Sequence, residues 1–124
     1  MEMHNPAPQV GAILWARLPE DGGDAKAKMR PVVVLDVSSL NGLTYVTVAK
    51  GTSQHIDEVY LGEFVVRSPV DLESCSLTKP TKFQLQRREK LPLTEAWFWM
   101  GKRVTMPRHL LQRLVVAAQE IHLI

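Results

Sequence analysis

The sequence predicts a small, mainly β domain (α+β class) that one C-terminal helix completes. Residues 31–37 (PVVVLDV) are largely β-branched with a single acid, which is typical of a buried strand. The pair Asn41-Gly42 stands between two strand-like stretches and is the strongest short-range signal for a tight hairpin. Apolar residues recur at helical spacing between residues 110 and 121. Short strands followed by one final helix favour a small β barrel that the helix seals.

Composition sets the limits of this domain. The chain has 124 residues, of which 45% are hydrophobic and 23% charged, as in an ordinary single-domain globular protein. We therefore expect a flexible N-terminal tail over residues 1–9 and one domain over residues 10–124. The net charge of +2 permits an anionic partner without requiring one.

The first half of the domain is predicted as three strands. Residues 10–17 are largely apolar and read as the first strand. Residues 18–29 contain a Gly pair and no hydrophobic period, so they form a long loop of the kind that is often functional or mobile. Pro31 has no N–H for a ladder and is expected to begin the second strand. Residues 44–50 are its hairpin partner.

The second half continues with short strands and ends in the helix. The expected segments are a polar loop over 51–58, short strands over 63–67 and 76–78, a strand over 81–87, and a β segment over 97–105 bent at Gly101. Pro107 suits the first turn of the helix, with Thr105 as its cap. The apolar positions of the helix are Leu110, Leu111, Leu114, Val115, Ala118 and Ile121.

Arg30 stands where the long loop meets the buried strand. Pro31 biases Arg30 towards an extended backbone, so one guanidinium is held at the mouth of a rigid strand. Antiparallel pairing of the hairpin should bring Arg30 close to residues 50–53. Binding chemistry is often placed at such a junction between loop and scaffold.

Four stretches resemble, in order, the PemK/MazF (Kid-like) toxins of type II toxin–antitoxin systems. They are residues 11–15 (GAILW), 30–34 (RPVVV), 46–53 (VTVAKGTS) and the closing segment 101–123. Together they span almost the whole chain. The resemblance implies an SH3-like barrel, a homodimer, and an endoribonuclease that cuts single-stranded RNA and is neutralised by a cognate antitoxin.

The resemblance also implies roles for residues. It makes Arg30 catalytic, as an electrostatic stabiliser whose fork matches two phosphate oxygens. The hydroxyl residue at the end of the third strand is Thr52 or Ser53, and Thr52 is preferred because Gly51 before it permits a close backbone approach. The expected RNA-binding residues are Lys28, Lys50, His55, Lys79 and Lys82. Without the resemblance, a surface ion pair of Arg30 and a solvated strand face for the lysines would be the simpler interpretations.

The expected activity is sequence-selective cleavage by attack of the 2′-OH, without metal or cofactor. The four histidines have no zinc-like spacing, and the lone Cys75 lacks a CxxC partner or a neighbouring His. No apolar stretch approaches a membrane span, and the N-terminus does not resemble a signal peptide, so we expect a cytoplasmic protein.

Two departures from the family keep a second hypothesis open. One is the approach to Arg30, residues 26–29 (KAKM), where many relatives have Gly and Gln residues. Active relatives tend to carry an arginine in the segment that matches residues 77–83, and this chain has only Lys79 and Lys82 there. A lysine binds phosphate as a point charge and lacks the bidentate fork. The alternative is a divergent, non-catalytic PemK-like barrel that binds a protein partner or nucleic acid.

Overall fold

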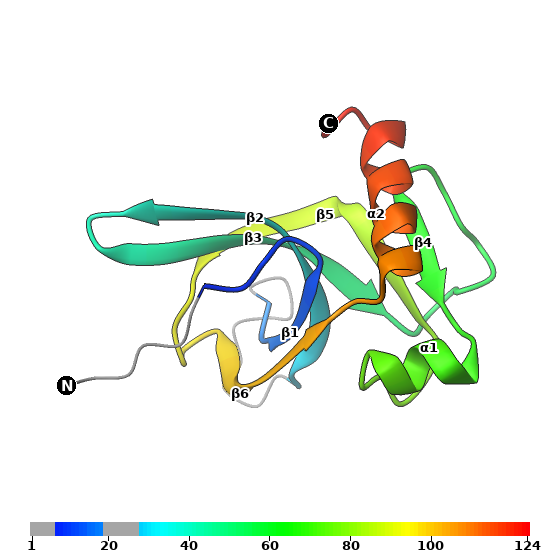
Figure 1. Ribbon diagram of the computed structural model, residues 1–124, viewed down its shortest axis with the longest axis horizontal. Coiled ribbons are helices and arrows are strands. Elements are labelled where there is room, and N and C mark those ends of the chain that lie inside the picture. Colours follow the sequence, from blue (N-terminus) through cyan, green and yellow to red (C-terminus); the bar gives the residue numbers. More distant parts are fainter. Residues whose placement is uncertain (1–6, 19–27) are drawn as a thin grey trace.

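Six strands and two helices make up the computed structural model, which describes residues 7–18 and 28–124. The strands are β1 (Ala12–Ala16), β2 (Arg30–Leu40), β3 (Leu43–Thr52), β4 (Glu63–Val66), β5 (Thr81–Pro92) and β6 (Phe98–Thr105), and the helices are α1 (Pro69–Ser74) and α2 (Arg108–Glu120). All strand pairs are antiparallel, and the sheet order is β4-β5-β3-β2-β1-β6. Helix α2 stands beside β4 at one end of the sheet (Figure 1). The predicted mainly β fold with a C-terminal helix is confirmed.

The predicted hairpin is formed by β2 and β3, which project together from the body of the molecule (Figure 1). Asn41 and Gly42 both have positive φ angles, 52° and 81°, and Leu40 pairs with Leu43 across them. Two positive φ angles at the centre are what a type I′ turn requires, and Asn-Gly adopts them readily. The pairing continues to Val32 and Lys50, with one register shift between Val34 and Asp36.

The segment between β4 and β5 corrects one prediction. Residues 76–78 do not form a strand, because the preceding residues form helix α1, which ends at Ser74. The Ser68 hydroxyl accepts a hydrogen bond from the Asp71 N–H at 3.2 Å, and Pro69 occupies the first turn. Ser-Pro is therefore an N-cap followed by a favourable first helical residue, a helix-start signal that was present in the sequence.

The other strand boundaries differ in detail from those predicted. Strand β4 lies where a short strand was expected, and β2 begins at Arg30, one residue before Pro31. Strand β5 extends beyond residue 87 to Pro92, and β6 continues through Gly101 without a break. The pairing of β1 with β6 shifts register between Leu14, opposite Arg103, and Ala16, opposite Phe98. The extra residues of this irregularity therefore lie in β6, in the stretch that contains Gly101, where the bend was expected.

Helix α2 begins at Arg108 with Pro107 at the N-cap position and no side-chain cap. Thr105 is the last residue of β6, so its predicted capping role is wrong. The buried residues of the helix are Leu110, Leu114, Ala117 and Ala118. Val115, predicted on the apolar face, is 43% exposed. Neither helix in the described ranges is long and apolar enough to cross a membrane.

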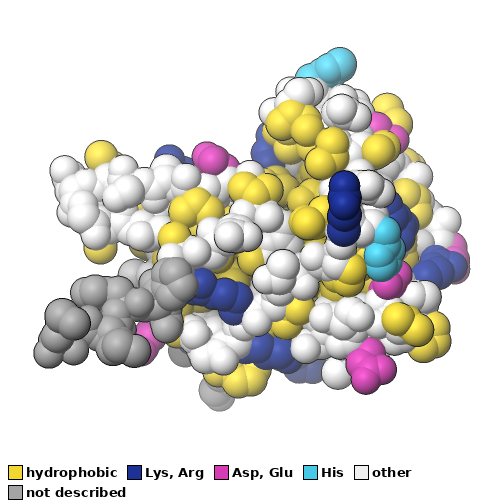
Figure 2. Space-filling model, in the orientation of Figure 1, with side chains coloured by type: hydrophobic (Ala, Val, Ile, Leu, Met, Phe, Trp, Pro, Cys, Tyr) yellow, Lys and Arg dark blue, Asp and Glu magenta, His cyan; other side chains and the backbone are white. Residues whose placement is uncertain are grey.

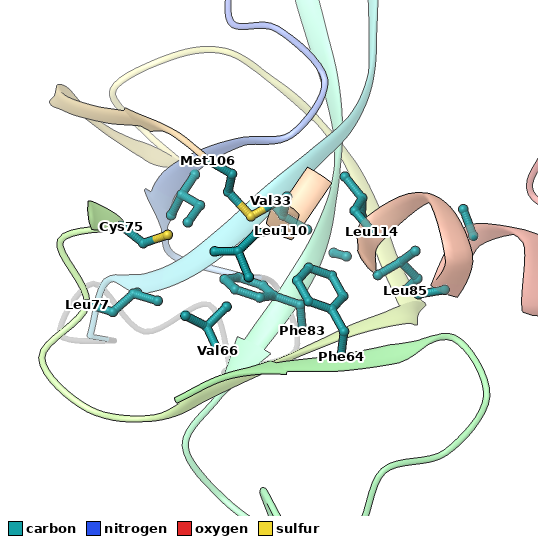
Figure 3. Close-up of a cluster of buried hydrophobic side chains, with 14 of the residues drawn as sticks. Val33, Phe64, Val66, Cys75, Leu77, Phe83, Leu85, Met106, Leu110 and Leu114 are labelled. Atoms are coloured by element: carbon teal, nitrogen blue, oxygen red, sulfur yellow. The ribbon is translucent and has the colours of Figure 1, made fainter. Parts of the chain in front are cut away.

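Strand β2 contributes to hydrophobic clusters on both sides of the sheet. Val33 belongs to the cluster beneath α2, which contains Phe64, Phe83 and Leu110 (Figure 3). Val32 and Val34 point the other way, into a second cluster. Because successive side chains of a strand alternate between faces, a strand buried on both sides reads as a continuous apolar run. This placement explains the β-branched stretch and holds the start of β2 rigidly.

Cys75 is fully buried in the first cluster. Burial, with a smaller contribution from the charge of Asp71, raises the pKa of its thiol to about 11. At neutral pH the thiol is therefore protonated and unsuited to nucleophilic attack. It packs as a small apolar side chain.

Candidate functional site

A cavity of about 220 Å³ lies where β2 begins and β3 ends. Arg30 pairs with Ala16 of β1, and two residues further along β2 Val32 pairs with Lys50 of β3. Arg30 therefore lies beside the last residues of β3, and Gly51 and Ser53 line the same cavity as Arg30. The predicted proximity of Arg30 to residues 50–53 is confirmed. The cavity is completed by residues 76–79, by Thr81, and by Trp15 of β1 and Lys102 of β6.

Gly51 allows the strands to meet closely beneath this cavity. A Cβ atom at this position would lie 2.6 Å from the Pro31 carbonyl oxygen and 2.9 Å from Cε1 of Phe83. Backbone and a buried ring cannot move aside easily, so a side chain here would separate β3 from its neighbours. The close approach at Gly51 is thus one between strands, and Gly51 lines the cavity together with Ser53.

The described residues that line the cavity carry charges of one sign. Four cationic side chains line it, and among its described lining residues none is acidic. The cations are Lys28, Arg30, Lys79 and Lys102, and the hydroxyl residues beside them are Ser53, Ser76, Thr78 and Thr81. Figure 2 shows lysine and arginine side chains along the lower edge of the molecule, between β6 and α1. A concave site of one charge sign concentrates anions, and hydroxyl groups add donors for their oxygens.

The two candidate hydroxyls occupy different positions. Ser53 lines the cavity, whereas Thr52 does not. The Thr52 hydroxyl oxygen accepts a hydrogen bond from the Gln54 N–H at 3.1 Å, which is a local turn contact. The geometry therefore favours Ser53 over Thr52 as the hydroxyl that faces a ligand.

Lys82 lies away from the cavity and is buried. Its ammonium group donates to the backbone carbonyls of His55 and Glu58, at 3.0 and 2.7 Å, and its Nζ lies 3.3 Å from Oε1 of Glu63. Both side chains of this ion pair are nearly inaccessible, at 3% and 1% exposure. This position disagrees with the expected role of Lys82 in RNA binding. The ammonium group instead ties the loop after β3 to the sheet.

Glu63 is the centre of that buried network. Burial opposes its ionisation, but a hydrogen bond from the Tyr60 N–H, together with those from Gln84, Gln86 and Lys82, outweighs burial. The pKa of Glu63 is consequently lowered from its ordinary value. The carboxylate is thus charged at neutral pH, and it balances Lys82.

The remaining predicted residues divide into two groups. Lys28 and Lys79 are exposed and line the cavity. Lys50 is half-buried within β3 and does not line it. His55 is also outside the cavity, on an exposed loop, with its Nδ1 3.9 Å from Oε2 of Glu58.

Trp15 and Lys102 were missed by the sequence interpretation. The ammonium group of Lys102 lies 3.9 Å from the centre of the Trp15 ring, which is a close cation–π contact. Strand β6 pairs with β1, with Ile13 opposite Val104 and Leu14 opposite Arg103, and this pairing brings Lys102 across to Trp15. The sequence showed a basic pair in the last strand but no signal for which strand it would pair with.

A larger hollow of about 590 Å³ lies elsewhere, between β4, α1 and α2. It contains both charge signs: His109 Nε2 lies 2.7 Å from Oδ1 of Asp71, and Glu120 accepts a hydrogen bond from the Gly62 N–H. Arg67, also in this lining, pairs with Asp57 at 3.1 Å. A hollow that contains carboxylates as well as cations attracts a further anion weakly, so the smaller cavity, with no acid among its described lining residues, is the better anion site.

Comparison with known proteins identifies the family of the chain. A search of curated proteins finds no match. The model of one protein family matches residues 9–114, which is most of the chain and includes every residue that lines the smaller cavity. The chain therefore belongs to the family of PemK-like, MazF-like toxins of type II toxin–antitoxin systems.

Proposed function

We propose that this toxin is a sequence-selective, metal-independent endoribonuclease that cleaves single-stranded RNA in the cavity beside Arg30. The observation that carries the proposal is the set of four cations and a serine hydroxyl in one cavity, with no acid among its described lining residues. A phosphodiester is the anion that fits these donors best, because it offers two non-bridging oxygens to a guanidinium fork. The resemblance to ribonuclease toxins supplies the reaction.

In the proposed reaction the 2′-oxygen attacks the adjacent phosphorus, and the bond to the 5′-oxygen breaks. The 2′-OH loses its proton, the 5′-oxygen gains one, and the products are a 2′,3′-cyclic phosphate and a 5′-OH. Arg30 stabilises the charge of the pentacovalent phosphorane with its planar fork. Ser53 donates a hydrogen bond to a phosphate oxygen. Lys28, Lys79 and Lys102 attract the neighbouring phosphates.

Single-stranded RNA is the proposed substrate because the RNA backbone must rotate about the phosphate that is cleaved. In-line attack requires the 2′-oxygen and the leaving 5′-oxygen to lie on opposite sides of phosphorus, and a stacked A-form helix resists that geometry. An unpaired, splayed base also permits sequence-selective reading. The cavity holds about 220 Å³, which suits one phosphate and its sugar better than a duplex.

Membership of the family implies an antitoxin partner. We further propose that the protein is a cytoplasmic homodimer. Apolar surface supports this state: Val115 and Val116 of α2 are 43% and 54% exposed, and a small domain gains stability by covering such surface. Sedimentation at micromolar concentration should then give about twice the chain mass of 14.0 kDa. A monomer at that concentration would overturn this part of the proposal.

The experiment that tests the activity is analysis of product ends. Wild type is incubated with single-stranded RNA in excess EDTA, and the ends are identified by mass spectrometry. We expect 2′,3′-cyclic phosphate and 5′-OH ends, which are lost in Arg30→Ala and retained in Arg113→Ala, a variant in the larger hollow. Binding of RNA without any product would favour the non-catalytic alternative. That alternative is supported by one observation, the lack of an arginine between residues 77 and 83.

A further inference from the structure

Trp99 presents a half-exposed indole next to the cationic cavity. The side chain is 52% exposed, although it extends from the last strand of the sheet. The Lys102 ammonium lies 5.4 Å from the centre of the Trp99 ring and 3.9 Å from that of the buried Trp15. Lys102 and Trp15 both line the cavity. One ammonium group therefore connects the exposed indole to the anion site.

The backbone beside Trp99 fixes where the indole lies. A Cβ atom at Gly101 would come within 3.2 Å of the indole Nε1, so the ring lies closely over the glycine backbone. This contact and the cation–π contact from Lys102 both restrict the ring. An aromatic ring that is already restrained and still half-exposed has little further conformational freedom to lose on binding.

We propose that Trp99 is a stacking platform for an unpaired base of single-stranded RNA, next to a phosphate bound in the cavity. The inference rests on the proposed function and adds the position at which a base is held. Base–aromatic stacking beside a positively charged groove is the general means of holding single strands. Lys102 contributes to both the stacking platform and the phosphate site, because its ammonium lies by the Trp99 ring and its side chain lines the cavity.

A protein surface is the rival occupant of an exposed indole. The charge of the neighbouring cavity favours an RNA base over a protein surface, because the cavity has four cations and no acid among the described residues that line it. An unpaired nucleotide brings a flat π-face and a phosphate together, and it matches both features at once. An apolar protein surface would match the indole alone and would bring no anion to the cavity.

The test compares Trp99→Ala and Trp99→Phe with Tyr60→Ala. Tyr60 is a matched control because it is an exposed aromatic with a lysine over its ring, Lys82 at 5.9 Å, and lies outside the cavity. The probe is a fluorescein-labelled single-stranded RNA of about ten nucleotides with random sequence. Its riboses carry 2′-O-methyl groups, so it lacks the nucleophile and reports binding alone. Inorganic polyphosphate is the base-free probe.

We expect Trp99→Ala to bind the RNA at least about fivefold, and up to about 150-fold, more weakly than wild type. Polyphosphate binding should stay within about twofold, because stacking requires a base. Trp99→Phe should retain most of the RNA affinity, and Tyr60→Ala all of it. Quenching of tryptophan fluorescence by RNA should be reduced in Trp99→Phe.

The outcomes separate this inference from the proposed function. Unchanged RNA affinity in Trp99→Ala, with cleavage by wild type intact, would overturn the stacking platform and leave the nuclease standing. Equal losses of RNA affinity and polyphosphate affinity in Trp99→Ala would also overturn the stacking platform. A sedimentation mass of Trp99→Ala that is half that of wild type would overturn it as well, because it would assign the indole to a protein interface. A Trp99-dependent affinity in a protein that cuts no RNA would support the platform while the proposed cleavage fails.

Discussion

The two hollows of the molecule differ in size and in charge balance. The larger one, about 590 Å³ between β4, α1 and α2, contains histidine and arginine side chains that face carboxylates. The smaller one, about 220 Å³ at the ends of β2 and β3, has four cations and no acid among its described lining residues. Volume alone would select the larger hollow, whereas the charges of the lining residues favour the smaller one for an anionic substrate. An excess of one charge sign in a concave site is the more informative feature.

Two lysines of the basic stretch over residues 79–90, which contains Lys79, Lys82, Arg87, Arg88 and Lys90, show how position decides the role of a charge. Lys79 precedes β5, is exposed, and lines the cationic cavity. Lys82 lies within β5 between β3 and β4, where Val65 is its direct partner, and its ammonium group pairs with Glu63. The first lysine is available to a ligand, and the second stabilises the loop that follows β3.

The largest effect expected from this contrast is on stability. Lys82→Met leaves the Glu63 carboxylate buried without its cation, and it should lower the free energy of unfolding by about 3 kcal/mol. Lys79→Met removes an exposed charge and should change it by less than about 0.5 kcal/mol. Urea unfolding followed by tryptophan fluorescence measures both. Equal stability of the two variants would contradict the assigned role of the ion pair.

A smaller effect separates the two hydroxyl residues. Ser53→Ala should lower the cleavage rate about five- to tenfold, because one hydrogen bond of about 1 kcal/mol to the phosphate is lost. Thr52→Ala should lower the rate by less than about twofold, since its hydroxyl makes a turn contact with Gln54. The rates are measured with a fluorogenic RNA. The reverse ranking would restore Thr52 as the hydroxyl that contacts the substrate.

The smallest expected effect is on the salt dependence of RNA binding. With few cations engaged, the log–log slope of affinity against salt should be on the order of −2 to −4. Lys79→Ala should make this slope shallower by about one unit, which corresponds to the loss of one phosphate contact. Lys90→Ala is the control, because Lys90 belongs to the same basic stretch, is exposed, and lies outside the cavity. If Lys90→Ala changed the slope and Lys79→Ala did not, the result would indicate that RNA binds outside the cavity.

Local signals in the sequence were sufficient for much of the fold. Asn41-Gly42 fixed the β2–β3 hairpin, and the register of that hairpin placed Arg30 beside residues 51 and 53. Helix α1 was missed although Ser68-Pro69 is a helix-start signal, because a helix of 6 residues shows no period. The expected tail falls mainly on residues 1–6, outside the described ranges.

The site was harder to predict because its parts come from distant strands. Lys82 alternates with Phe83 along β5 and so looked solvent-facing, but Glu63 on the neighbouring β4 pairs with its charge. Lys102 joins the cavity only because β6 pairs with β1. Periodicity shows which residues share a face of a strand, whereas strand order decides whether a face is covered and by which charge.

The exchange of Arg30 for lysine tests the central claim most directly, that a preorganised guanidinium in the cationic cavity stabilises the phosphorane. Arg30→Lys keeps the charge, so binding of 2′-O-methyl RNA should stay within about threefold of wild type. Its cleavage of unmodified RNA in EDTA should fall by about 100-fold, the cost of removing one preorganised stabiliser. Thermal melts should coincide with those of wild type. Cleavage by Arg30→Lys as fast as by wild type would contradict the claim.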